Sequence, residues 1–213
     1  VDEDYPLGID VSMVKQIYDN GGQYYNHEGV AQDVYQILKS HGVNYIRIRL
    51  WNDPYNHIID ANQNVTKVTY GGGINDLETD LVIAKDAVAA GLKILLDFHY
   101  SDFWADPSNQ VIPKAWKDFT TPAQVEEALY TFTKETLEAF EAVGALPHMV
   151  QIGNETTPGL FTQYPGPTNS TLTGNSPYYL TQKTALSRDI AGTSGSANFI
   201  RYIQAGIRAT HDV

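Results

Sequence analysis

Four short apolar runs, each followed by a stretch of helical periodicity, constrain the fold of this chain more than any other feature. The runs lie near residues 7–10, 44–51, 93–100 and 149–152, and the helical patterns near residues 30–41, 77–90, 121–143 and 199–210. Strands that alternate with helices pair in parallel through right-handed crossovers. Each run also carries polar or aromatic residues at its carboxyl end. That placement favours a (β/α)8 TIM barrel over a doubly wound α/β sheet.

The length of the chain predicts part of such a barrel. Four βα units occupy 213 residues, whereas a compact barrel of eight units needs about 250. We therefore expect residues 1–213 to form a single barrel domain that supplies about the first four βα units, the N-terminal half. Alone, this half exposes two sheet edges, which we expect the missing C-terminal half or a second copy to cover.

Glycine and proline mark the ends of the expected helices. Gly42, Gly91 and Gly144 close the first three helical patterns, as glycine commonly does at a helix carboxyl end. Pro122 occupies the first position of the third helix, where its missing N–H costs nothing. Residues 52–75 and 156–195 are expected to be long loops.

Composition excludes several classes of function. The net charge of −11 argues against nucleic acid as a partner, because phosphate binding needs a basic face. No apolar run approaches the about 18 residues of a membrane span, and no basic segment with an apolar run marks a signal peptide. The 14 tyrosines and 3 tryptophans suit a carbohydrate ligand.

Motifs for metals, nucleotides and serine hydrolysis are missing from the sequence. The histidines are scattered without His-x-x-x-His spacing and there is no cysteine, so no metal site and no cofactor are expected. A structural Ca²⁺ held by loop aspartates stays open. No Gly-x-Gly-x-x-Gly follows a strand and no Gly-x-Ser-x-Gly elbow occurs.

The second strand has two unlike faces. Its isoleucines alternate with Tyr45, Arg47, Arg49 and Trp51, which in a parallel barrel point inward, where buried arginines need carboxylate partners. We expect Arg47 to be salt-bridged inside the barrel. Arg49, one step nearer the strand end, is the better candidate for the functional site.

An amide and a carboxylate, Asn154 and Glu155, end the fourth strand. Ligands bind at the carboxyl ends of parallel strands, and a carboxylate above apolar packing can act as a proton donor. The alternative is a glutamate that caps the next element or faces solvent. If the sheet curls, Arg49, His99 and this pair converge, as sugar hydrolysis with two carboxylates requires. Glu155 would be the acid and Asn154 would hold the sugar 2-hydroxyl.

Other side chains near the strand ends have two interpretations. His99 is either a site residue or a core histidine with satisfied hydrogen bonds. Trp104 and Trp116 either stack on sugar rings or pack their loop. Asp97, two residues below His99, is expected to lie deeper and to pair with an arginine rather than attack a substrate.

Several longer motifs resemble glycoside hydrolase family 53, the endo-β-1,4-galactanases (arabinogalactan endo-β-1,4-galactosidases). They are Gly-Ile-Asp-Val-Ser at 8–12, Ile-Arg-Ile-Arg-Leu-Trp at 46–51, Leu-Asp-Phe-His-Tyr-Ser-Asp-Phe-Trp-Ala-Asp-Pro at 96–107 and Gln-Ile-Gly-Asn-Glu at 151–155. The third motif is long and specific. The Asn-Glu pair is shared by a wider clan of barrel glycosidases.

The resemblance implies a (β/α)8 barrel that hydrolyses β-1,4-galactan or arabinogalactan with retention at the anomeric carbon, in a secreted, extracellular protein. It implies that Glu155 is the acid/base, that Asn154 lies beside it, and that Arg49 and His99 support carboxylates and substrate. Asp102 and Trp104 would help line the sugar cleft. The family's nucleophile is a glutamate at the seventh strand, to which no part of this chain corresponds. The segment after Glu155, Thr-Thr-Pro-Gly-Leu-Phe, also departs from the family.

Two other functions stay open at this point. One is a galactan-binding fragment without turnover, because the chain carries one of two catalytic carboxylates. The other is a related barrel glycosidase that acts on mannan or glucan and shares the Asn-Glu pair.

Overall fold

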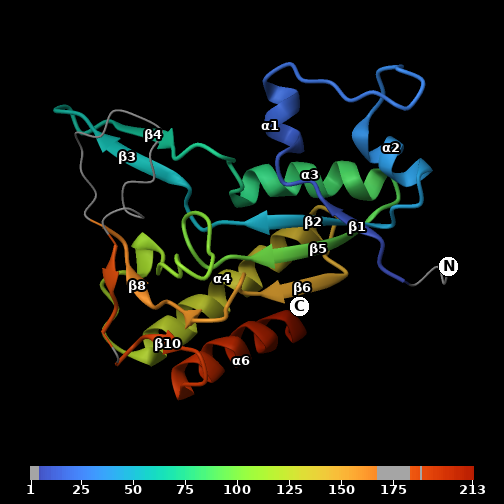
Figure 1. The fold of residues 1–213 in the computed structure, drawn as a ribbon. Coiled ribbons are helices and arrows are strands. Elements are labelled where there is room, and N and C mark those ends of the chain that lie inside the picture. Colours follow the sequence, from blue (N-terminus) through green and yellow to red (C-terminus); the bar gives the residue numbers. More distant parts are fainter. Residues whose placement is uncertain (1–4, 167–182, 188) are drawn as a thin grey trace.

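A parallel sheet forms the centre of the computed structural model, which describes residues 5–166, 183–187 and 189–213. Its strands are β1 (Gly8–Asp10), β2 (Tyr45–Leu50), β5 (Lys93–Phe98) and β6 (Met149–Ile152), in the order β1-β2-β5-β6 (Figure 1). All three pairings are parallel. The predicted βα order and the fold class are confirmed, with four strands of the barrel in this chain.

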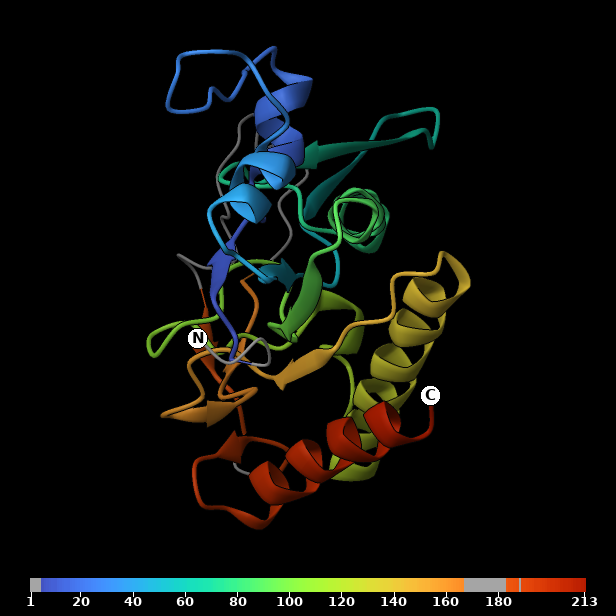
Figure 2. The same cartoon turned by 90° about the vertical axis from the view of Figure 1, so that its right-hand side faces the viewer.

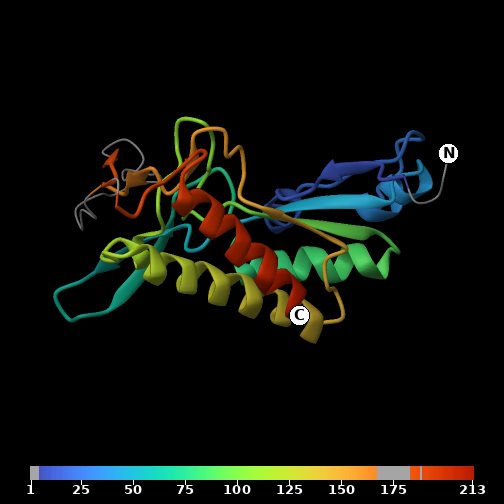
Figure 3. The same cartoon turned by 90° about the horizontal axis from the view of Figure 1, so that it is seen from below.

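Helices cover one face of this sheet. Figures 2 and 3 show α3 (Leu77–Ala89), α4 (Pro122–Ala142) and α6 (Ala197–His211) on the same side of the strands. The strand residues that face them, Ile46, Ile48, Leu50, Ile94 and Leu96, are fully buried. Burying each of these side chains contributes about 1.5–3 kcal/mol to the stability of the fold. Because this face of the sheet is held against the helices, the alternate, polar side chains of the strands lie on the opposite face.

The helices begin and end where the sequence indicates. Thr121 and Gln124 form a reciprocal capping box at the start of α4, with Pro122 in the first turn, and Ser196 caps α6 through the N–H of Phe199. Gly42, Gly91 and Gly144 all have positive φ, which glycine adopts without the steric cost of a Cβ.

The expected loop at residues 52–75 is wrong, because it contains a hairpin. β3 (Tyr55–Ile59) pairs antiparallel with β4 (Val65–Thr69) and extends beyond the carboxyl end of β2 (Figure 1). Asp60 closes the turn by accepting from the backbone N–H groups of Asn62 and Asn64. Both strands are rich in β-branched residues, which favour strand structure. The polar and glycine-rich residues around them had suggested a loop instead.

Two helical expectations also need correction. A short helix, α1 (Val14–Asp19), follows β1 and is absent from the expected elements. The next helix, α2 (Val34–Ser40), excludes Val30, which is 56% exposed. Asp33 accepts from Tyr35 N, and this N-cap starts the helix four residues later than the apolar pattern suggested.

The expected loop at residues 156–195 lies partly outside the described residues. Its described parts contain two short antiparallel pairs: β7 (Gly159–Leu160) with β10 (Gly192–Thr193), and β8 (Gln163–Tyr164) with β9 (Thr184–Ala185). A 3-10 turn, η1 (Lys114–Trp116), precedes α4. Within the described part of the chain, no helix combines the length and apolarity that a bilayer crossing requires.

Candidate active site

Arg47 of β2 contacts residues of β1, of β5 and of the segment after β6 on the polar face. Its Nη1 lies 2.7 Å from Asp10 Oδ2 of β1, and its Nη2 lies 2.6 Å from Asp97 Oδ2 of β5. Nη2 also donates to Asn154 Oδ1, which follows β6, at 2.9 Å. The predicted salt bridge of Arg47 is confirmed, as is the pairing of the fully buried Asp97 with an arginine.

Asp10 is held as a carboxylate by this network. Burial alone would raise the pKa of Asp10, but hydrogen bonds from Ser12 and the contact with Arg47 outweigh burial and lower it. The partly buried arginine therefore has two carboxyl partners, Asp10 and Asp97.

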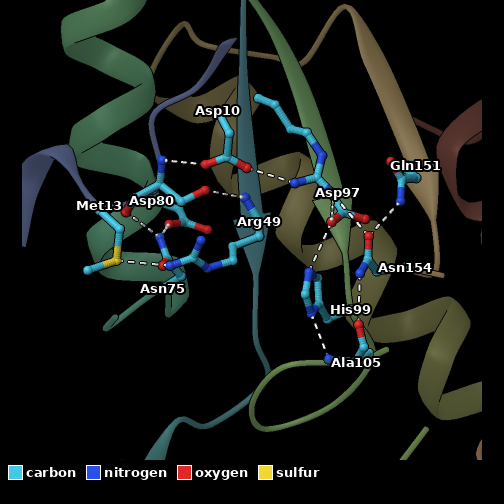
Figure 4. A network of polar contacts seen from close by, with 12 residues as sticks. Asp10, Met13, Arg49, Asn75, Asp80, Asp97, His99, Ala105, Gln151 and Asn154 are labelled. Atoms are coloured by element: carbon cyan, nitrogen blue, oxygen red, sulfur yellow. Dashed lines mark hydrogen bonds and ion pairs between the residues drawn. The ribbon is translucent and has the colours of Figure 1, made fainter. Parts of the chain in front are cut away.

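His99 has one ring nitrogen fixed as an acceptor. Its Nδ1 accepts from Trp51 Nε1 at 3.2 Å and from Ala105 N at 3.0 Å. A nitrogen that receives two N–H groups carries no proton, so the proton of the neutral ring is on Nε2. Nε2 lies 3.0 Å from Asp97 Oδ2, as Figure 4 shows for the ring, Asp97 and Ala105.

Asn154 is oriented from both sides of its amide. Its Oδ1 accepts from Arg47 and from Gln151 Nε2, at 2.9 and 3.2 Å, and its Nδ2 donates to Ala105 O at 2.8 Å (Figure 4). Both lone pairs of Oδ1 are therefore used. One N–H of Nδ2 is left for a further partner.

Glu155 follows with an exposed side chain and a left-handed backbone, φ 48°. A positive φ is uncommon for a residue with a Cβ and marks a sharply turned main chain. Tyr100, directly after His99, has φ 51°. The chain thus turns in the same unusual way after β5 and after β6.

Arg49 is buried in an aromatic and polar cage. Its guanidinium lies 4.2 Å from the Trp104 ring centroid and 5.0 Å from that of Trp51, and Trp104 is 38% exposed. The Trp104 ring also contacts His99, with centroids 5.9 Å apart. Arg49, His99 and Trp104 therefore belong to one contact network, and Ala105 links it to Asn154.

Behind Arg49 lies a buried pair that the sequence did not single out. Asn75 Nδ2 donates to Asp80 Oδ1 and to Ser12 O, each at 2.9 Å (Figure 4). Burial raises the pKa of Asp80 well above its ordinary range. Asp80 lies on the apolar face of α3 between Leu77 and Ala84. A charged residue on the apolar face of an expected helix was the feature of the sequence that could have indicated this buried pair.

Asp102 lies apart from this network. It is buried, and its Oδ2 accepts from Lys114 N at 2.7 Å. Lys114 Nζ lies 3.5 Å from the same oxygen and 3.0 Å from Asp53 Oδ2. Asp102 thus joins its loop to the base of the β3–β4 hairpin. Lys114, like Gln110 below, sits in a segment without periodicity, so nothing in the sequence pattern indicated it.

The two loop tryptophans differ in role. Trp116 is buried, with its ring edge-on to Phe132 and Phe161, so it packs the loop, whereas Trp104 keeps an exposed surface beside Arg49. In the described residues, no three His, Cys, Asp or Glu side chains are grouped closely enough to hold a metal ion.

Parallel βα order, with an Asn–Glu pair, an arginine, a histidine and a tryptophan at the carboxyl edge, defines the class of barrel glycoside hydrolases. The model of glycosyl hydrolase family 53 matches residues 6–213. The chain belongs to this family.

Known proteins agree with that assignment. An endo-beta-1,4-galactanase of Bacillus subtilis is 45% identical over 159 residues, covering 75% of this chain and 35% of the relative. An arabinogalactan endo-beta-1,4-galactanase of Cellvibrio japonicus is 37% identical, covering 70% of this chain and 36% of the relative. The GH53 catalytic domain of Ignisphaera aggregans superposes with a TM-score of 0.78 at 36% identity, over 100% of this chain and 49% of that one. The chain thus spans half or less of these proteins.

Proposed function

We propose that the protein containing this chain is an endo-hydrolase of β-1,4-galactosidic linkages in galactan or arabinogalactan, with Glu155 as acid/base. The observation that carries this proposal is the strained, outward-facing Glu155 beside the fixed Asn154. Galactanase names among the relatives support the substrate. Because galactan is a polymer, we place the protein outside the cell.

Asn154 suits the recognition of a sugar hydroxyl. Its Oδ1 is engaged by Arg47 and Gln151, and one N–H by Ala105 O. The remaining N–H donates to the 2-hydroxyl of the sugar next to the scissile bond. Such a bond strengthens in the transition state of glycoside cleavage.

Arg49, His99 and Trp104 shape the surface beside that sugar. Trp104 offers an exposed ring for stacking, and the guanidinium of Arg49 lies against the same ring. His99 holds Asp97 and the Ala105 main chain in place. Asp102 contributes to the cleft through the loop that it fixes to Lys114.

The nucleophile lies outside this chain in our proposal. Retention needs two carboxyl groups about 5–5.5 Å apart across the scissile bond. The two aspartates on the polar face, Asp10 and Asp97, are both engaged by Arg47, so neither is free to attack. The rest of the barrel supplies the second carboxylate.

Reducing-sugar release from galactan, mannan and glucan by the intact protein tests this function. We expect reducing sugar to be released from galactan alone. NMR should detect the β-anomer as the first product, because the configuration is retained. Glu155→Gln should lower kcat by 10²–10⁴-fold, as loss of a general acid/base does, while galactan binding persists. The control Glu138→Gln changes an exposed carboxylate of α4 that pairs with Lys134 and should retain full activity.

Three outcomes would contradict the proposal. Full activity of Glu155→Gln would remove its acid/base role. Preference for mannan or glucan would indicate a related barrel glycosidase. Binding of galactan by the intact protein without product would indicate a non-catalytic binding protein.

A further inference from the structure

The side chain of Gln110 contacts the main-chain carbonyls of Asn154 and Glu155. It lies in the loop between β5 and η1 and is 2% exposed. Its Nε2 lies 2.8 Å from Asn154 O, 3.3 Å from Glu155 O and 3.2 Å from Asp106 O. The other amide orientation would place Oε1 against three carbonyl oxygens, so the network itself fixes which atom is nitrogen.

The turn that Gln110 contacts is strained. Glu155 adopts φ 48° and Gly153, two residues earlier, φ 86°. A left-handed non-glycine residue is strained and persists when its surroundings hold it. The carbonyls of Asn154 and Glu155 both point to one amide. Rotating either peptide plane to relieve the strain would break these bonds.

The loop that carries Gln110 is itself tied to the site. Ala105 N donates to His99 and Ala105 O accepts from Asn154. The backbone O of Gln110 accepts from Thr162 N and Gln163 N. Gln110 is therefore anchored through its own backbone carbonyl, and its side chain transmits that position to Glu155.

We propose that Gln110 is a positioning residue that sets the direction of the Glu155 carboxyl group. This inference rests on the proposed acid/base role of Glu155. Gln110 touches no reacting atom. It holds the peptide on either side of the Glu155 Cα, and thereby determines where the proton donor points.

The test separates leaving groups that need protonation from those that do not. In the intact protein, Gln110→Met keeps side-chain length and removes the donor. A misplacement of about 1 Å costs about 10²-fold, so kcat/KM for phenyl β-galactobioside should fall about 10- to 100-fold. For the 2,4-dinitrophenyl analogue, whose leaving group departs without a proton, kcat/KM should stay within about threefold of wild type.

Gln163→Met is the matched control. Gln163 Nε2 donates to Ser108 O in the same loop at 3.1 Å, away from the Asn154–Glu155 carbonyls. Gln110→Met loses the contacts of one amide with three carbonyls and Gln163→Met loses one hydrogen bond, so both variants should have a lowered Tm. The leaving-group dependence should change in the Gln110 variant alone. Equal leaving-group responses in the two variants would overturn the inference.

A second variant keeps the test decisive if Gln110→Met does not fold. In Gln110→Glu, the introduced carboxyl donates one hydrogen bond when protonated and none when ionised. Its kcat/KM for the phenyl substrate, divided by that of wild type, should fall at least about fivefold between pH 5 and pH 7. A constant ratio would count against the positioning role.

The two proposals fail in different ways. A fully active Glu155→Gln would refute the proposed function. An inactive Glu155→Gln together with a Gln110→Met variant of unchanged leaving-group dependence would refute the positioning role alone.

Discussion

Asp102 is buried beside Lys114, and its burial makes the stability of the folded protein depend on pH. Burial raises the pKa of Asp102 to about 6, against an ordinary value of 3.8, even though Lys114 acts in the opposite direction. Between these values the folded protein keeps a proton that the unfolded chain has lost. Stability must therefore fall as the pH rises from about 4 to about 6, by up to about 3 kcal/mol for this group.

Asp102→Asn should flatten that part of the stability curve. The amide oxygen still accepts from Lys114 N, while the titrating proton is gone. Urea unfolding of the intact protein at pH 4, 5 and 6 measures the slope, with Asp118→Asn as the control at an exposed carboxylate of a neighbouring segment. An unchanged slope in Asp102→Asn would assign the pH dependence to other groups.

At this scale the sequence predicts residues on strands better than residues in loops. Arg47 and Asp97 lie on strands, where alternation determines which side chains share a face and strand order determines their neighbours. Gln110 and Lys114 act through contacts between loops that are more than 40 residues apart, such as the contact of Gln110 with Asn154. No periodicity encodes such contacts.

Helix α6 approaches the sheet at a glycine. A Cβ on Gly206 would lie 2.6 Å from Ile152 Cγ2 and 3.1 Å from the hydroxyl of Tyr100. In a loosely packed helix, Gly→Ala would stabilise by about 1 kcal/mol. Here the overpacking costs about 1–3 kcal/mol. The close contact therefore makes a Gly206→Ala substitution destabilising rather than stabilising.

Gly206→Ala should therefore lower the free energy of unfolding by up to about 2 kcal/mol, measured by urea denaturation of the intact protein. Ile207→Ala, at the neighbouring half-exposed position, controls for general sensitivity of the helix. A stabilised Gly206→Ala would mean that α6 does not pack closely on β6.

Among the elements, those with strong periodicity or caps were predicted and the others were not. The central strands and α3, α4 and α6 follow clear apolar patterns. The β3–β4 hairpin and α1 do not, because the two hairpin strands pair with each other and α1 places a single buried residue, Val14, in the core. Val30 shows the converse error, since an apolar residue beyond an N-cap extended the pattern past the helix.

As a whole, the described sheet ends in two edge strands, β1 and β6. Leu7, Ile9 and Met149, at or beside these edges, are exposed. Unpaired strand edges with apolar side chains associate with other chains. We expect a polypeptide of residues 1–213 alone to self-associate and to leave galactan uncleaved, because the proposed mechanism places the second carboxylate outside these residues.

Sedimentation velocity and reducing-sugar assays on that polypeptide check both expectations, with the intact protein as the positive control. A monomeric fragment that releases galacto-oligosaccharides would show that four βα units suffice. The number of units relative to length predicted a partial barrel, and the structure has it.

The contacts of Arg47 form at different times during synthesis. Asp10, 37 residues earlier, has already left the ribosome when Arg47 emerges, whereas Asn154 follows 107 residues later. At about 5–20 residues per second, that interval lasts on the order of 5–20 s. The growing chain thus neutralises the arginine with Asp10 first and with Asp97 next. Asn154 arrives last, so the turn formed by Asn154 and Glu155 docks onto a charge cluster that is already assembled.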